Sequence, residues 1–112
     1  MVKKIKDFGI MLKTYRKKRD ISQRELSAAV GIDYTYISKI ENGKADPPSE
    51  EAIIKIAETL GEDPDVMLIT AKKIPTEFKN LIFKNKDVLD FLRKADTLSS
   101  QQWNSIRQII KN

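Results

Sequence analysis

Residues 31–44, GIDYTYISKIENGK, place hydrogen-bonding side chains on one side of a short predicted helix. On a helical wheel of about 100° per residue, Ile37 and Ile40 share one face and Glu41 lies beside them. The opposite face carries polar or charged side chains, flanked by two tyrosines in the first turn: Thr35, Ser38, Lys39, Asn42, Tyr34 and Tyr36. Because every amphipathic helix has a polar side, the wheel alone leaves open whether this face binds a ligand or is solvated.

The composition argues against most catalytic and metal-binding chemistry. The chain has no cysteine and no histidine, so it offers no thiolate nucleophile, imidazole base or disulfide. It also has no glycine-rich phosphate loop and no calcium-loop spacing of carboxylates. We therefore expect a protein that is not an enzyme and needs no metal or other cofactor. The lack of cysteine fits a cytoplasmic protein, and no stretch approaches the ~20 apolar residues of a membrane span.

Charge is unevenly distributed along the chain. The net charge is +5, but residues 1–20 are strongly basic, residues 21–69 are net acidic, and residues 70–112 are basic again. This balance suits a polyanionic partner without identifying one. The acids of the middle segment fall mainly at 46–65, outside the polar face of the helix at 34–42.

Start and stop signals divide the first part of the chain into helices. Periodic apolar residues predict a first helix at about Lys4–Lys18, with these side chains on one stripe: Ile5, Phe8, Leu12 and Tyr15. Ser22 and Glu25 have the spacing of a capping box, so a second helix should begin there, and Gly31 should end it in the left-handed conformation. Asp33 is the expected N-cap of a third helix that runs to about residue 42.

Two further helices complete this part of the chain. Ser49 should cap a fourth helix to Leu60, and Asp63 a fifth that has Pro64 at its first position. The second and third helices are too short to be stable alone, because helices below ~12 residues are marginal in water. They must pack together across the turn at Gly31, which is the arrangement of a helix-turn-helix unit.

Residues 5–69 resemble the Cro/C1-type (Xre-family) helix-turn-helix domain of phage repressors and small bacterial regulators. The resemblance runs through SQRELSAAVGIDYTYISKIENGKADPPSEEAIIKIAETLG, and it includes the QxxL motif, the turn glycine and YISKIENGK. It implies an all-α protein: a five-helix, lambda-repressor-like DNA-binding domain at 1–69 with a short helical C-terminal extension at 70–112. It also implies a transcriptional regulator, which we expect to be a repressor that binds a palindromic operator in double-stranded DNA as a homodimer.

The resemblance implies a role for particular residues of this sequence. Base-facing positions are Tyr34, Thr35, Tyr36 and Lys39. Phosphate-contacting positions are Gln23, Arg24, Ser38, Asn42 and Lys44. Arg16 is implied to pair with Glu41 in a partly buried ion pair, the alternative being two exposed charges. Asp20 stands where many relatives have glycine, and aspartate tolerates the left-handed conformation better than most residues.

The tail at 70–112 lies outside the resemblance. Helical patterns predict segments at about 76–84 and 87–95, and a last helix that begins at Ser99, where Gln102 completes a capping box. One face of that helix is apolar and predicts a dimer or partner interface: Trp103, Ile106, Ile109 and Ile110. The alternative is that this face folds back onto other apolar residues of the tail: Phe78, Leu81 and Phe91.

Two functions are compatible with these features. The first is the DNA-binding regulator described above. The second is a protein-interaction module or antitoxin, in which the C-terminal helices bind a partner such as a toxin or a protein antagonist and DNA binding is secondary or lost.

Overall fold

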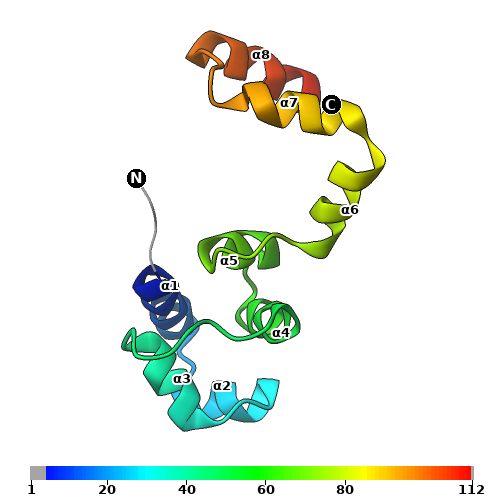
Figure 1. The fold of residues 1–112 in the computed structure, drawn as a ribbon. Helices are drawn as coiled ribbons and strands as arrows, with labels where there is room; N and C mark the ends of the chain where they lie inside the picture. Colours follow the sequence, from blue (N-terminus) through cyan, green and yellow to red (C-terminus); the bar gives the residue numbers. More distant parts are fainter. Residues whose placement is uncertain (1–4, 112) are drawn as a thin grey trace. The chain divides into compact units, whose positions relative to one another are not determined.

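The computed structural model describes residues 5–111, and the regular structure in this range is entirely helical (Figure 1). In chain order the helices are α1 (Ile5–Lys18), α2 (Gln23–Val30), α3 (Tyr34–Glu41), α4 (Glu50–Leu60), α5 (Pro64–Thr70), α6 (Thr76–Lys84), α7 (Lys86–Ala95) and α8 (Ser100–Lys111). The all-α fold class is therefore confirmed. Lys4, at which the sequence predicts the first helix to begin, lies outside the described residues, and so does the side chain of Ile5.

The chain forms two compact units that divide between Pro75 and Thr76. The first unit contains the five helices α1–α5, and the second contains α6, α7 and α8. Residues 71–75 continue the first unit: the Lys73 amide donates a 2.9 Å hydrogen bond to the Leu68 carbonyl, and Pro75 is buried.

The predicted start and stop signals of the first unit are confirmed. Ser22 Oγ accepts a hydrogen bond from the Glu25 amide at 3.0 Å, and the Glu25 carboxylate accepts one from the Ser22 amide at 2.8 Å. These hydrogen bonds from the backbone and side chain of Ser22 hold the pKa of the Glu25 carboxyl below its ordinary value. Gly31 ends α2 at φ 75°, and Asp20 takes the left-handed conformation at φ 55°. The next helices begin at side chains that accept hydrogen bonds from the first turn: Asp33, Ser49 and Asp63.

The core of the first unit draws on all five of its helices. α3 packs against α1 and α2, while α4 packs against α2 and α5. Burial of a large apolar side chain contributes about 1.5–3 kcal/mol, so this core can hold α2 and α3, which are too short to persist alone. The buried apolar residues are Phe8, Leu12, Leu26, Val30, Ile37, Ile40, Ile53, Ile56, Ala57, Leu60, Met67 and Leu68.

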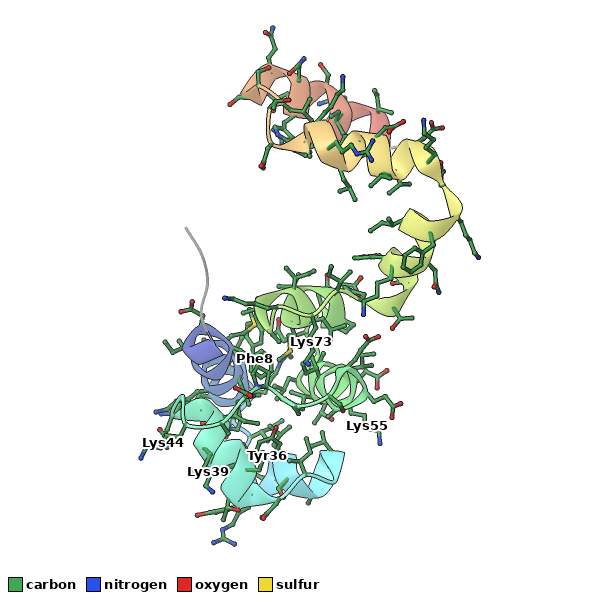
Figure 2. The ribbon with its side chains drawn as sticks, in the orientation of Figure 1. Phe8, Tyr36, Lys39, Lys44, Lys55 and Lys73 are labelled. Atoms are coloured by element: carbon green, nitrogen blue, oxygen red, sulfur yellow. The ribbon has the colours of Figure 1, made fainter. Side chains whose placement is uncertain are left out.

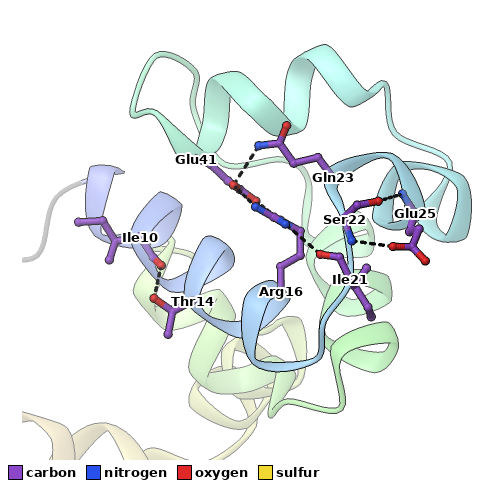
Figure 3. Close-up of polar contacts among 8 residues, drawn as sticks. All are labelled: Ile10, Thr14, Arg16, Ile21, Ser22, Gln23, Glu25 and Glu41. Carbon is purple, nitrogen blue, oxygen red and sulfur yellow. Dashed lines mark hydrogen bonds and ion pairs between the residues drawn. The ribbon is translucent and has the colours of Figure 1, made fainter.

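A buried polar cluster joins α1, α2 and α3 (Figure 3). Arg16 Nε and Nη2 donate to the two carboxylate oxygens of Glu41 at 2.7 and 2.8 Å, and Arg16 Nη1 donates to the Ile21 carbonyl at 2.9 Å. Gln23 Nε2 completes the cluster with a 3.0 Å hydrogen bond to Glu41 Oε1. The Glu41 side chain is only 1% exposed, and its hydrogen bond with Arg16 raises the pKa of that guanidinium. The pair is thus bidentate and almost free of solvent, which makes it specific in geometry.

Gly9 allows α1 to approach the last turn of α3 closely. A Cβ atom built on Gly9 would lie 2.2 Å from the carbonyl oxygen of Ile40, which is far inside van der Waals contact. Nothing in the sequence marks this position, because a glycine within a helical pattern carries no local sign of what packs against it. Together, Gly9 and Arg16 fix where α3 lies on α1.

We expect Arg16→Ala to lower the free energy of unfolding by about 3 kcal/mol, because Glu41 would be left as an uncompensated buried charge. Urea unfolding followed by circular dichroism measures the loss. Lys17→Ala, which removes the same charge from an exposed neighbour, is the matched control and should change little. Arg16→Met combined with Glu41→Leu should recover most of the stability, since both charges are then gone. A single Arg16→Ala variant as stable as the control would contradict the assignment.

We expect Gly9→Ala to destabilise the first unit by about 1–3 kcal/mol, because the added methyl group meets backbone that cannot move without shifting α3. The direction of the change in stability is informative, since an ordinary Gly→Ala substitution within a helix stabilises a protein by up to about 1 kcal/mol. Thermal unfolding of Gly9→Ala beside the exposed α1 variant Lys13→Ala provides the measurement. A higher melting temperature for Gly9→Ala would show that the close approach is absent.

Candidate nucleic-acid interface

The outer face of α3 is accessible in the first unit. Ile37, Ile40 and Glu41 are buried on the inner side of the helix. The opposite side, together with the turn that follows it, forms what we call the α3 surface: Tyr34, Thr35, Ser38, Lys39, Asn42 and Lys44. Figure 2 shows Lys39 and Lys44 pointing outward from this surface. Thr35, Lys39, Asn42 and Lys44 are exposed, whereas Tyr34 and Ser38 are half-buried.

The first turn of α3 is fixed by its N-cap. One Asp33 carboxylate oxygen accepts from the Thr35 amide at 3.2 Å, and the other accepts from Thr35 Oγ1 at 2.8 Å. These hydrogen bonds from Thr35, led by that of its hydroxyl, hold the pKa of the Asp33 carboxyl below its ordinary value. Because the hydroxyl proton of Thr35 is used within the chain, Thr35 can present an oxygen acceptor and a methyl group to a ligand, but no strong donor.

Tyr36 holds the loop that follows α3. Its half-buried ring packs against the core, and its hydroxyl donates a 3.0 Å hydrogen bond to the Asp46 carbonyl. The structure therefore gives Tyr36 a contact within the chain in addition to the base-facing role that the resemblance implies. The sequence offered no signal for this bond, since Asp46 lies in an irregular segment between α3 and α4.

Two residues at the start of α2 contact α3. The Arg24 guanidinium carbon lies 4.2 Å from the centroid of the Tyr34 ring, a cation–π contact. Gln23, which the resemblance assigns to a phosphate, donates one amide N–H to Glu41 and keeps a second N–H for another acceptor. α2 therefore adds Arg24 and Gln23 to the edge of the α3 surface.

The α3 surface and its edge are predominantly basic. Arg24, Lys39 and Lys44 are exposed, and the carboxylate of Asp33 beside them accepts hydrogen bonds from Thr35. The acids at 46–65 lie on α4, on α5 and in the loops before them. Such a surface can bind a polyanion through its cations and can read hydrogen-bonding groups through its polar side chains.

Other kinds of site find little support in the part of the chain that the structure describes. No group of three or more carboxylate, imidazole or thiolate side chains is placed there to hold a metal ion. Across residues 5–111, no helix has the length and apolarity needed to cross a membrane.

Comparison with known proteins identifies a family and several relatives of this chain. Residues 12–67, half of the chain, match the family model described as helix-turn-helix. The ImmF control region 10 kDa protein of Bacillus phage phi105 is 33% identical over 72 residues, which cover 64% of this chain and 79% of the phage protein. The HTH-type transcriptional repressor RghR of Bacillus subtilis is 26% identical over 112 residues, covering 93% of this chain and 82% of RghR.

The fold also occurs in a solved structure. A chain in the structure titled SinR protein/SinI protein complex superposes with a TM-score of 0.53 at 23% identity, covering 93% of this chain and 94% of that one. At this identity the likeness shows a shared fold and no more. The match over residues 12–67 and the relatives named as regulators lead to one conclusion. This chain belongs to the Cro/C1-type (Xre) helix-turn-helix family of transcriptional regulators.

Proposed function

We propose that the protein is a sequence-specific DNA-binding repressor that binds a palindromic operator as a homodimer, with α3 in the major groove. The observation that carries this proposal is the α3 surface, which is basic and rich in hydrogen-bonding groups. The other side of the same helix is buried in the core. The kinship with a protein named as a transcriptional repressor supports it. As a regulator of transcription, the protein would act in the cytoplasm.

The proposed roles follow from where the side chains lie. Thr35 and Lys39, exposed on successive turns of α3, would face base edges, with Tyr34 beside them and Tyr36 at the loop. Gln23, Ser38, Asn42 and Lys44 would contact phosphates at the margin of the helix. Phosphate contacts set position and affinity, whereas base contacts set sequence preference.

The second unit supports the homodimer because it lacks a core of its own. None of the side chains described at 76–111 is buried. The rings of Trp103 and Phe91 contact each other edge to face, with their centroids 6.1 Å apart. Part of the apolar face of α8 is therefore used in a contact within the chain. Ile109 and Ile110 nevertheless remain 76% and 73% exposed. A second copy that covers them would bury apolar surface. A dimer carries two α3 helices, one for each half-site of an operator whose half-sites lie about 34 Å apart.

A partner protein on the same surface is the second candidate function. The structural neighbour was solved in a complex between a SinR protein and a SinI protein. A partner that covers Ile109 and Ile110 in place of a second copy would make the tail a receptor for an antagonist or toxin. The mass of the purified protein in solution separates the two candidates.

We expect Lys39→Ala to weaken binding to a duplex selected from random DNA by about tenfold, because a specific base contact contributes about 1–3 kcal/mol. Fluorescence anisotropy at several salt concentrations is the measurement, and wild-type affinity should fall steeply between about 50 and 200 mM salt. Lys55→Ala is the matched control, since Lys55 is exposed on α4, outside the α3 surface (Figure 2). Equal losses for the two variants, or wild-type binding that is insensitive to salt, would contradict the proposal.

We expect Ile109→Glu combined with Ile110→Glu to convert a dimer into a monomer, because two charges cannot be buried at an apolar interface without partners. Sedimentation equilibrium measures the mass, and operator affinity should fall with it. Gln108→Glu, exposed on the same helix, is the control for added charge.

A truncation after Pro75 should likewise leave a folded first unit with weaker operator binding. Unchanged mass and affinity in both cases would remove the dimerisation claim.

A further inference from the structure

We propose that Arg24 of α2, held over the ring of Tyr34, reads a guanine at the edge of the base sequence that α3 contacts. The inference deepens the proposed function and rests on it. It also differs from the phosphate-contacting role that the family resemblance implies for Arg24. The partner group is defined by its chemistry: the O6 and N7 acceptors that guanine displays in the major groove.

Arg24 differs from the other arginines within residues 5–111 in having no polar partner there. Arg16 is bound by Glu41 and Ile21, and Arg19 donates to the Gly61 carbonyl. In the second unit, Arg93 lies beside Asp90 and Arg107 donates to Asn104. The Arg24 guanidinium stacks on the ring of Tyr34, and that contact uses none of its N–H donors in a hydrogen bond. Its hydrogen-bonding capacity therefore remains available to a ligand.

Tyr34 places this guanidinium where bases are read. Tyr34 is the first residue of α3, and the N-terminal residues of a recognition helix are those that approach base edges. With its guanidinium carbon 4.2 Å from the ring centroid, Arg24 is held from α2 beside the first turn of α3. Such pre-organisation reduces the conformational entropy that a free arginine would lose on binding.

The first turn of α3 lacks a strong donor of its own at Thr35. The hydroxyl proton of Thr35 is committed to Asp33, so this side chain offers an acceptor and a methyl group. Lys39, the cation of α3 itself, lies one turn further along. Guanine presents two acceptors, which the planar fork of an arginine matches with paired hydrogen bonds. Arg24 supplies the donor pair that the beginning of α3 lacks.

The test uses the full chain and DNA that lacks a single acceptor. A duplex is first selected from random DNA with the wild-type protein, and each of its guanines is then replaced singly by 7-deazaguanine, which removes N7 and keeps base pairing. We expect one replacement in each half-site to weaken wild-type binding about fivefold or more. The same replacement should leave binding by the Arg24→Met variant unchanged, because methionine keeps an unbranched side chain of similar length and has no N–H donor for N7. Circular dichroism checks that each variant is folded.

Two variants of Tyr34 test the positioning. Tyr34→Phe keeps the ring and should retain the sensitivity to 7-deazaguanine, whereas Tyr34→Leu removes the ring face and should reduce it. The inference is overturned if Arg24→Met selects the same sequence with the same 7-deazaguanine profile and only a uniformly lower affinity, which is the behaviour of a phosphate contact. A selected sequence without guanine overturns it as well. If the wild-type protein selects no sequence at all, the proposed function fails, and this inference fails with it.

Discussion

The Arg16–Glu41 ion pair ties three helices together at one buried point. The carboxylate of Glu41 lies at the end of α3 and receives hydrogen bonds from α1 through Arg16 and from α2 through Gln23. Because the charges are almost free of solvent, each partner requires the other, and displacement of either would cost several kcal/mol. The inner side of α3 is thereby held in one rotation about its axis, and that rotation decides which side chains form the outer surface.

Much of the outer surface is organised by contacts within the chain. Asp33 orients Thr35, and the Asp46 carbonyl accepts a hydrogen bond from the Tyr36 hydroxyl. Thr35 is thereby left with an oxygen acceptor and a methyl group to present, while the cation Arg24 lies over Tyr34 and Lys39 is exposed one turn further along α3. A side chain whose hydroxyl proton is already engaged offers only its acceptor, so a DNA group that is itself an acceptor is disfavoured at that position.

Local features of this fold were predictable from sequence, and long-range contacts mostly were not. The caps at Ser22 and Asp33 and the stop at Gly31 involve residues that are neighbours in the chain, so their spacing was sufficient. The left-handed Lys72, which follows the C-cap of α5 at Ala71, carries no such signal because lysine has no preference for that conformation.

Contacts between helices depend on packing that periodicity does not describe. The approach of Gly9 to Ile40 and the stacking of Arg24 on Tyr34 are of this kind. The ion pair between Arg16 and Glu41 could be predicted only from the family resemblance. The candidate DNA-contacting roles also came from that resemblance, and the structure adds which of their protons are already used.

The absence of buried side chains at 76–111 bears on how this protein can change over evolutionary time. In the first unit, a substitution at Phe8 or Leu26 disturbs a core before it affects anything outside the chain. In α8, a substitution at Ile109 or Ile110 alters an exposed apolar surface and leaves no internal cavity. Duplicated copies of such a gene would be free to acquire new associations through the tail while they keep the same fold at the other end.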